Sequence, residues 1–336
     1  MKKIIKITNN KSPKLFRIEW GVSNLCNRKC WYCFPGANEG TIPLPTDVEL
    51  LKKNFSALFD RYKEHGIDQF EILLTGGEPT LWKEFPIMLE FFRKNYNIVI
   101  RTLTNGYKSL EWWKQYAKFF DHVEISVHNE NSNIGHIISV ADYLFESETM
   151  VVANVLMDPK NFDICKDIVE KLKTSKHPWP IIAKTVFFQG VPNYTEEQKS
   201  YFKEKNKHRM PDKELVRKFF KGPLEESRYW ATYDNGETFE LPHDRWLALE
   251  NLNHFYGWQC NLGVEAIQIT MDGMLTGNCI QPLYEGDQHY SILDPKFSEK
   301  FKPTIKPTIC KQLTCTCTTD IHFNKSKITE NFNESK

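Results

Sequence analysis

The stretch RIEWGVSNLCNRKCWYC, residues 17–33, joins an apolar run to a loop that carries three cysteines. Residues 17–23 have the composition of a strand, and Cys26, Cys30 and Cys33 follow in a C-x3-C-x2-C pattern. A structural zinc site uses four ligands, often in C-x2-C pairs, whereas a cubane held by three cysteines leaves one iron open. The pattern therefore favours an iron–sulfur cluster with an open iron over a zinc knuckle or three space-filling thiols.

The overall composition is that of a globular protein without a charge bias. The 336 residues are 40% hydrophobic, and 44 Lys and Arg balance 43 Asp and Glu, which gives no reason to expect a nucleic acid or an anionic membrane as partner. The start of the chain lacks the apolar core of a signal peptide, and no stretch approaches the roughly 20 apolar residues of a membrane span. A cytoplasmic location is therefore expected. Cytosolic thiols stay reduced and nine cysteines cannot all pair, so metal binding is favoured over disulfides.

Short apolar runs alternate with amphipathic stretches over the first 190 residues. Strands are expected at 17–23, 70–77, 97–106, 122–128, 150–157 and 181–190, and helices at 47–66, 83–95, 109–119, 136–146 and 160–174. Such alternation is typical of a parallel sheet with helices outside. The sequence therefore predicts an α/β fold, a partial (β/α)6 TIM-like barrel with its chemistry at the carboxyl ends of the strands.

The cysteine loop resembles the signature of the radical S-adenosylmethionine (radical SAM) enzymes, C-x3-C-x-aromatic-C, which Cys26, Cys30, Tyr32 and Cys33 fill here. The resemblance implies a [4Fe–4S] cluster that binds S-adenosyl-L-methionine (SAM) at its open iron. It implies reductive cleavage of SAM to a 5′-deoxyadenosyl radical, which abstracts a hydrogen atom from the substrate. A low-potential electron donor such as flavodoxin or ferredoxin is implied as a partner.

Motifs at the ends of later strands agree with this resemblance. The run LTGGEPTLW (74–82) closes the second strand with two glycines, which allow close approach of a ligand, and with the anion of Glu78. In the family this element binds the amino group of the methionine moiety. TNG (104–106) and SVH (126–128) close the next two strands, and His128 departs from the Ser and Asp that the family often uses for the ribose. The cofactor contacts expected are Tyr32, Gly76, Gly77, Glu78, Ser126, His128, Asn154 and Lys184. His128, Asn154 and Lys184 have as alternatives a substrate contact or an ordinary structural role.

A second group of cysteines follows at residues 260–317. The run CNLGVEAIQITMDGMLTGNC (260–279) predicts a hairpin with an Asp-Gly turn between two cysteines, and CKQLTCTC (310–317) adds three. This resembles the twitch extension, a shortened SPASM domain, which holds a second, auxiliary [4Fe–4S] cluster in several family members. The expected ligands are Cys260, Cys279 and two of Cys310, Cys315 and Cys317. Zinc is the alternative occupant.

The predicted organisation has four parts. They are a radical SAM partial barrel at 1–190, a bridging helical or irregular region at 191–255, a twitch-like domain at 256–320 and a polar tail at 321–336. The aromatic segment 231–258 is expected either to cover the barrel mouth or to serve as a structural bridge.

The reaction expected from the resemblance is an oxidation. An auxiliary cluster with four protein ligands has no open iron, so it would accept an electron from the substrate radical or hold its domain together. This favours a two-electron oxidation, a dehydrogenation or cross-linking, of a sugar-like small molecule or a peptide. The alternatives are a redox-neutral epimerase, in which a spare cysteine returns a hydrogen atom, and a non-catalytic cysteine-rich metal-binding protein.

Overall fold

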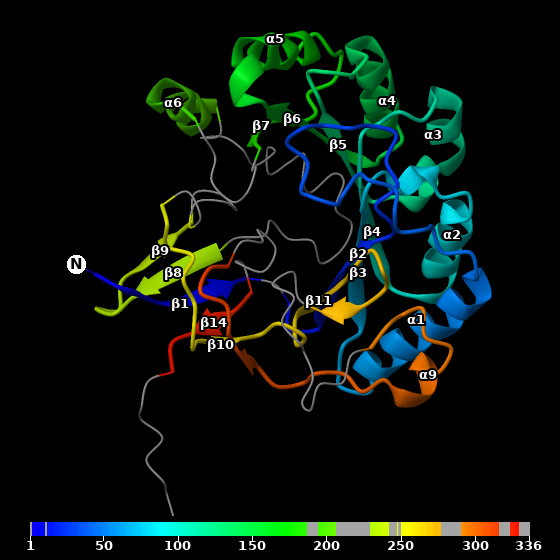
Figure 1. Cartoon of the computed structure of the whole chain (residues 1–336), viewed down its shortest axis with the longest axis vertical. Coiled ribbons are helices and arrows are strands. Elements are labelled where there is room, and N and C mark those ends of the chain that lie inside the picture. Colours follow the sequence, from blue (N-terminus) through cyan, green and yellow to red (C-terminus); the bar gives the residue numbers. More distant parts are fainter. Residues whose placement is uncertain are drawn as a thin grey trace, which may run out of the picture.

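The computed structural model describes residues 2–10, 12–186, 194–205, 229–241, 247, 250–276, 290–315 and 323–328. The described strands form two sheets, one of eight and one of six strands. Figure 1 shows helices α1 to α5 in an arc over the outer side of the larger sheet, with the smaller sheet near the N-terminus. No helix within the described ranges is long and apolar enough to cross a membrane.

Six consecutive strands of the larger sheet run parallel and are joined by helices, which confirms the predicted α/β fold. The strands are β2 (Leu15–Gly21), β3 (Gln69–Thr75), β4 (Ile98–Thr104), β5 (His122–Val127), β6 (Met150–Met157) and β7 (Ile181–Thr185). The helices are α1 (Val48–Lys63), α2 (Phe85–Asn95), α3 (Leu110–Tyr116), α4 (Ile134–Glu146) and α5 (Phe162–Leu172), with short 3-10 turns η1 (Pro79–Leu81), η2 (Ala117–Phe119) and η3 (Pro159–Asn161). The last strand, predicted at 181–190, ends at Thr185, since Val186 is no longer part of it; residues 187–190 lie outside the described ranges.

Helix α1 illustrates how the sequence builds the outer layer. The Asp47 side chain accepts a hydrogen bond from the Leu50 N–H at 2.9 Å and so caps the first turn. Past the last turn Gly66 has φ 86°, a conformation that glycine adopts without strain, as the sequence predicts for the helix end. Between these ends the apolar side chains recur at helical spacing and are buried: Leu51, Phe55, Leu58, Phe59 and Tyr62.

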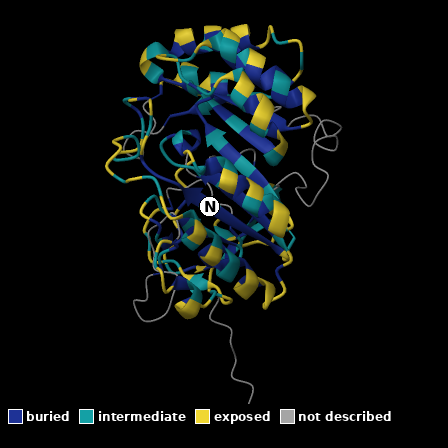
Figure 2. Cartoon of the chain, turned by 90° about the vertical axis from the view of Figure 1, so that its right-hand side faces the viewer, coloured by how far each residue is buried: buried dark blue, intermediate teal, exposed yellow. Residues whose placement is uncertain are grey.

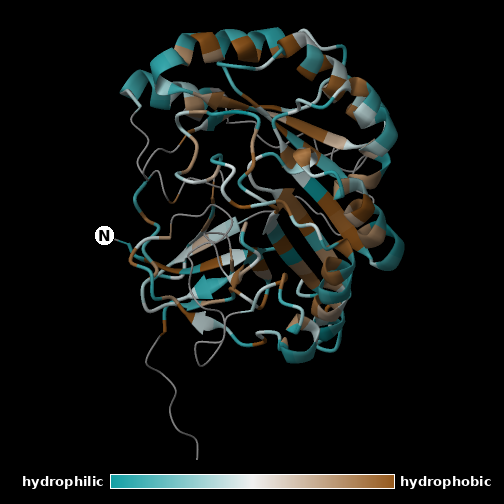
Figure 3. Cartoon of the chain, turned by 45° about the vertical axis from the view of Figure 1, so that its right-hand side comes forward, coloured by the Kyte–Doolittle hydropathy of each residue, from teal (hydrophilic) through white to brown (hydrophobic). Residues whose placement is uncertain are grey.

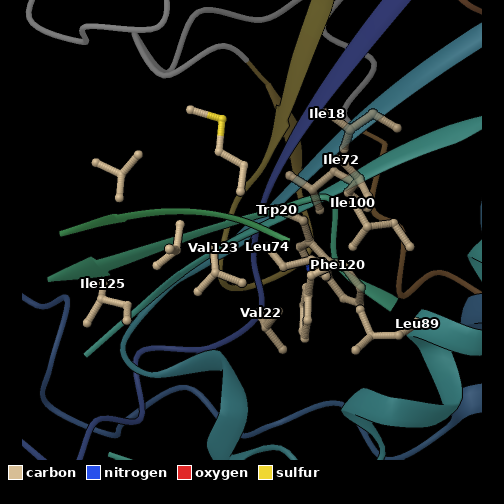
Figure 4. Close-up of a cluster of buried hydrophobic side chains, with 14 of the residues drawn as sticks. Ile18, Trp20, Val22, Ile72, Leu74, Leu89, Ile100, Phe120, Val123 and Ile125 are labelled. Carbon is tan, nitrogen blue, oxygen red and sulfur yellow. The ribbon is translucent and has the colours of Figure 1, made fainter. Parts of the chain in front are cut away.

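Side-chain alternation gives the parallel sheet an apolar outer face and a polar inner face. Phe70, Ile72 and Leu74 of β3 are at most 1% exposed, whereas Glu71 between them faces the inside. Figure 4 shows apolar side chains of neighbouring strands, such as Ile72 and Ile100, gathered with Leu89 of α2 in one buried cluster. The helices keep their exposed, hydrophilic residues on the solvent side (Figures 2 and 3). Burial of this outer face therefore fixes which strand residues point inward, where the chemistry is expected.

The predicted hairpin is confirmed, but it extends the larger sheet. Strand β11 (Ala266–Ile269) pairs in parallel with β2, and β12 (Leu275–Thr276) pairs antiparallel with β11. Gly273 in the Asp-Gly turn has φ 84°, as such a tight turn requires.

The smaller sheet draws strands from both ends of the chain, and sequence analysis did not predict it. Its order is β13-β10-β14-β1-β8-β9, all antiparallel. The strands are β1 (Ile4–Asn9), β8 (Tyr229–Tyr233), β9 (Thr238–Glu240), β10 (Gln259–Cys260), β13 (Thr308–Ile309) and β14 (Lys325–Ser326). The described ranges also contain the helices α6 (Glu196–Lys205) and α9 (Phe297–Lys300). Part of the segment 231–258 thus forms sheet, and β14 lies within the predicted polar tail.

Candidate functional site

The three-cysteine loop begins where β2 ends, at the carboxyl edge of the parallel sheet. Asn24 ties the two ends of the loop together: its side chain donates to the Gly36 carbonyl and the Thr41 hydroxyl, both at 2.8 Å, and accepts from the Ile42 N–H at 2.7 Å. Within the loop, the Cys33 N–H donates to the Cys30 carbonyl at 3.1 Å and forms a turn. The sequence between the strand and α1 therefore folds into a closed loop that carries the cysteines.

The three thiols of this loop lie close enough to influence one another. Burial, Glu130 and the neighbouring Cys33 raise the pKa of Cys30 to about 11, and burial and Cys26 raise that of Cys33. Across the described ranges no three His, Cys, Asp or Glu side chains already stand in a metal-coordinating arrangement. The three cysteine thiols fit an iron–sulfur cluster, because such clusters bind cysteine as thiolate. Binding to the metal would offset the repulsion between the thiolates.

A buried cation, Arg28, lies in the same loop and was missed by sequence analysis. Its guanidinium donates to the Ser132 hydroxyl at 3.0 Å and to the Asn105 carbonyl at 3.3 Å. Burial lowers the pKa of Arg28, and the ionised forms of Cys30 and Glu78 oppose that shift. A cation fixed beside three thiols lowers the energy of an anionic cluster at this place. The sequence signal that could have predicted this cation was a basic residue between Cys26 and Cys30.

Glu78 connects the ends of β3 and β4 from a position that is 1% exposed. Its Oε1 accepts from the Thr80 N–H and hydroxyl at 3.2 and 2.6 Å and from the Thr104 hydroxyl at 2.8 Å. Its Oε2 accepts from the Asn105 N–H at 2.7 Å. Burial raises the pKa of Glu78, and these donors act against that shift. Oε1 thus accepts three of these hydrogen bonds and Oε2 only one, so Oε2 keeps capacity for one more donor, such as an amine.

The two glycines before Glu78 allow a close contact with the chain's own backbone, whereas the sequence predicted the approach of a ligand. A Cβ at Gly76 would lie 2.4 Å from the carbonyl oxygen of Ser23, and one at Gly77 would lie 2.2 Å from that of Leu25. The Gly77 N–H donates to the Ser23 carbonyl at 2.7 Å, and the Glu78 N–H to the Leu25 carbonyl at 2.8 Å. The glycine turn is thus clamped directly against the backbone at the start of the cysteine loop.

His128 packs against the cysteine loop from the end of β5. Its Nδ1 lies 2.8 Å from the Tyr32 hydroxyl and 3.3 Å from the Cys30 Sγ, and the two rings are stacked with an interplanar angle of 9°. Burial and the nearby Arg28 lower the pKa of His128 to about 3, so the imidazole is neutral at neutral pH. Ser126, two residues earlier on the same inner face, is half-buried. The structure therefore brings the predicted residues Tyr32, Ser126 and His128 to one edge of the sheet.

Deeper inside the sheet, Asn154 belongs to an ionic network that sequence analysis missed. Its Nδ2 donates to Glu124 at 3.0 Å, and Arg101 bridges Glu124 at 2.6 Å and Glu71 at 2.7 Å. Burial opposes ionisation of Glu124, yet Arg101 and then Lys184 hold its pKa below the usual range. The signal for this network was one charged residue within each of the otherwise largely uncharged strands β3, β4 and β5: Glu71, Arg101 and Glu124. Asn154 and Lys184 therefore line the inside of the sheet, as expected for residues that could reach a ligand.

Residues 20–146, which include this loop, the glycine turn and His128, match the family model described as Radical SAM superfamily. These residues form a radical SAM domain. Such a domain implies a [4Fe–4S] cluster and SAM as its cofactors.

Known proteins share this domain with the chain. GTP 3′,8-cyclase of Psychromonas ingrahamii is 28% identical over 136 residues, which is 40% of this chain and 39% of the relative. The chain thus matches about two fifths of that relative's length. Among solved structures, anSMEcpe with bound AdoMet covers 56% of this chain and 58% of its own at 22% identity and TM-score 0.39. Streptococcus suis SuiB covers 82% and 62% at 16% identity and TM-score 0.44.

Outside the radical SAM domain, the second cysteine group lies around the smaller sheet. Cys260 is in β10, and the Cys310 N–H beyond β13 donates to the Trp258 carbonyl at 2.8 Å. Cys315 is buried, and Asn253 binds its backbone from both sides, accepting from its N–H at 2.8 Å and donating to its carbonyl at 2.6 Å. Cys310 and Cys315 contact one apolar cluster. The other two predicted ligands, Cys279 and Cys317, lie outside the described residues.

Proposed function

We propose that the protein is a radical SAM enzyme in which Cys26, Cys30 and Cys33 hold a [4Fe–4S] cluster. When bound, this cluster supplies the electron that cleaves SAM to a 5′-deoxyadenosyl radical, which then takes a hydrogen atom from the substrate. The observation that supports it best is the convergence of the cysteine loop and the glycine turn at one strand edge, joined by the Gly77–Ser23 and Glu78–Leu25 hydrogen bonds.

The surrounding residues of this chain have roles that follow from their contacts. Arg28 offsets the negative charge of the cluster, and the stacked Tyr32 and His128 shield one side of it from water. The Oε2 atom of Glu78 accepts a hydrogen bond from the amino group of SAM, and Ser126 binds the ribose of SAM.

We further propose a second [4Fe–4S] cluster on Cys260, Cys279 and two of Cys310, Cys315 and Cys317, with zinc as the alternative occupant. Four protein ligands leave no open iron, so this cluster would accept an electron from the substrate radical. That favours a two-electron oxidation of a sugar-like small molecule or a peptide, supported by a flavodoxin or ferredoxin as electron donor. The curated relatives' name adds GTP to the substrates worth assaying.

A redox-neutral epimerase remains a second candidate. Five cysteines compete for four positions, and Cys310 is only half-buried, so one thiol is available as a hydrogen donor.

Formation of 5′-deoxyadenosine by the anaerobically reconstituted, dithionite-reduced protein tests the proposal. We expect the wild type to cleave SAM, and the triple variant Cys26→Ala, Cys30→Ala, Cys33→Ala to lose cleavage. Cys165→Ser is the matched control: its thiol is buried in α5 and donates to the Leu156 carbonyl at 3.4 Å, so SAM cleavage should persist. Absence of cleavage in iron-loaded wild type would contradict the proposal.

A further inference from the structure

A tryptophan of the cysteine loop is hydrogen-bonded to the carboxyl end of strand β6. Trp31 follows Cys30 directly, and its indole N–H donates to the Oδ2 atom of Asp158 at 3.2 Å. Asp158 is the first residue after β6, at the same carboxyl edge of the sheet where the cysteine loop begins. This contact therefore ties the segment that carries two of the three cysteines to β6.

The carboxylate that accepts this hydrogen bond is itself held in place. Asp158 is fully buried, its Oδ1 accepts from the Lys160 N–H at 2.9 Å, and its Oδ2 also accepts from the Asn161 side chain at 2.8 Å. The carbonyl of the preceding residue accepts from the Tyr194 hydroxyl at 2.7 Å, and that of the following residue from the Gln198 side chain at 3.2 Å. A side chain locked in this way can hold a partner in one position.

Lys160, in the same turn, contacts the face of the Trp31 ring. Its ammonium nitrogen lies 3.8 Å from the ring centre. Aromatic rings have a negative face and a positive edge, so a cation over the face and a carboxylate at the indole N–H match the charge distribution of the ring. The turn after β6 thus holds Trp31 from two directions, and Tyr32 packs edge-on against it with ring centres 5.5 Å apart.

The position of this cysteine segment matters for the proposed SAM site. Glu78 and Ser126, which are proposed to bind the amino group and the ribose, lie at the ends of β3 and β5, whereas the loop would hold the iron. A SAM molecule must therefore reach the strand ends and the open iron at the same time. Displacing one set of groups against the other is costly, since a misplacement of about 1 Å can cost about a hundredfold in rate.

We propose that Asp158 is a positioning residue for SAM binding. Through Trp31 it fixes where the segment with Cys30 and Cys33 stands relative to the strand ends, and it acts without being a ligand of SAM or of iron. The inference rests on the proposed function, because it needs SAM to bind at the open iron of the first cluster. Loss of the contact should weaken SAM binding and leave the iron content unchanged.

The test is a double-mutant cycle on the anaerobically reconstituted full-length protein. SAM affinity, by equilibrium dialysis, and iron content are measured for Trp31→Phe, which removes the indole N–H, for Asp158→Ala, which removes the carboxylate, and for the two changes combined. Each single change should weaken SAM binding about tenfold, a size typical of residues that support metal ligands. The double variant should stay within about twofold of the weaker-binding single variant, because both changes break the same contact.

Trp113→Phe is the matched control. It makes the same chemical change at a fully buried ring of α3, whose Nε1 has no hydrogen-bond partner in the described part of the chain. Its SAM affinity should stay within about twofold of that of the wild type. Hydrogen exchange in the iron-free proteins gives a readout that depends on no cofactor: the amides of residues 26–33 should exchange faster in Trp31→Phe and at the wild-type rate in Trp113→Phe.

Wild-type SAM affinity in Trp31→Phe overturns the inference, and so does loss of iron from this variant, which would assign the contact to cluster binding instead. A double variant weakened by the product of the two single effects, about a hundredfold, also overturns it, because the two residues would then act separately. If Asp158→Ala does not retain iron, Trp31→Phe decides alone by the same measures. A wild type that takes up no iron, or holds iron and binds no SAM, is a separate result. It overturns the proposed function itself, and this inference falls with it.

Discussion

The two sheets of the molecule differ in how their strands are brought together. In the parallel sheet, spatial neighbours such as β3 and β4 are also neighbours in the chain, each joined by one helix. In the smaller sheet Lys6 pairs with Ser326, and Ile7 pairs with Ala231. The first cysteine site therefore depends on a local loop clamped to a local turn, whereas the second depends on pairings between the two ends of the chain. Damage to one sheet should thus affect one site more than the other.

The largest expected effect is on the charge network inside the parallel sheet. Arg101→Leu leaves Glu71 and Glu124 buried without their cation, and removing one partner of a buried ion pair costs roughly 3–5 kcal/mol. Unfolding by urea at pH 7 measures this loss. Arg61→Leu, which removes only an exposed pair with Glu64 on α1, is the control and should leave stability unchanged.

The pH dependence of the same variant has a definite sign. In the wild type the lowered pKa of Glu124 means that its contribution to stability is present above about pH 4.3 and is lost as the pH falls below that value. Removing Arg101 takes away the main influence that lowers the pKa of this carboxyl against burial, so that pKa should rise and the destabilisation should shrink between pH 7 and pH 5. A destabilisation that grows on acidification in this range would argue against the network.

Ile7→Ala tests whether the smaller sheet serves mainly the second site. Ile7 is fully buried in β1 and packs in the cluster with Cys315, so truncation should cost roughly 2–4 kcal/mol. We expect the second site to lose its iron. The first site should keep its iron and still cleave SAM. Equal loss of iron from both sites would show that the two sheets do not act separately.

A glycine pair compares the same chemical change in the two sheets. Gly77→Ala places a Cβ 2.2 Å from the Leu25 carbonyl oxygen, which forces the backbone at the start of the cysteine loop to move, at about 2–3 kcal/mol. Gly236→Ala, in the turn between β8 and β9, meets open space and bears only the strain of φ 85°, about 1 kcal/mol. Thermal unfolding and iron content measure both. Equal losses of stability and iron in the two variants would mean that the contact between the glycine turn and the cysteine loop is not needed for stability or iron binding.

Among the variants at the first site, the smallest effect is expected on SAM binding. Glu78→Gln keeps the side-chain shape but replaces one acceptor oxygen with a donor, so SAM affinity should fall about tenfold, or about 1.4 kcal/mol. Iron content should stay intact, because Glu78 is not a proposed ligand. Unchanged affinity would remove Glu78 from the proposed SAM site.

The sequence predicts the parallel sheet better than it predicts the smaller sheet. The alternation in β3 and β4 and the apolar stripe of α1 are local periodic signals, so the parallel sheet, its helices and the cysteine loop were predictable. Strands such as β10 and β14 have two residues each and no period, and only their long-range pairing defines them. Sequence alone cannot show such pairings.

Within the site, the sequence predicted which residues take part but not which of them contact one another. Glu78 and His128 were found from their motifs, but the pairing of Arg28 with Asn105 and the contact of His128 with Cys30 depend on loops meeting in space. The glycines of the GGE turn were predicted for ligand approach, and the structure shows that they meet the chain's own backbone. Lys325 was predicted to be in a solvated tail because its hydrophilic surroundings in sequence hide its pairing with Cys260.

The central claim is that Cys26, Cys30 and Cys33 hold a cluster with one iron open to SAM. The most direct measurement is the EPR spectrum of the anaerobically reduced protein before and after addition of SAM, with the second cysteine group replaced by Ala. We expect a [4Fe–4S] signal that changes shape when SAM binds, since SAM would occupy the open iron of the proposed cluster. A cluster signal that SAM leaves unchanged, or a protein that takes up no iron at these cysteines, would contradict the account.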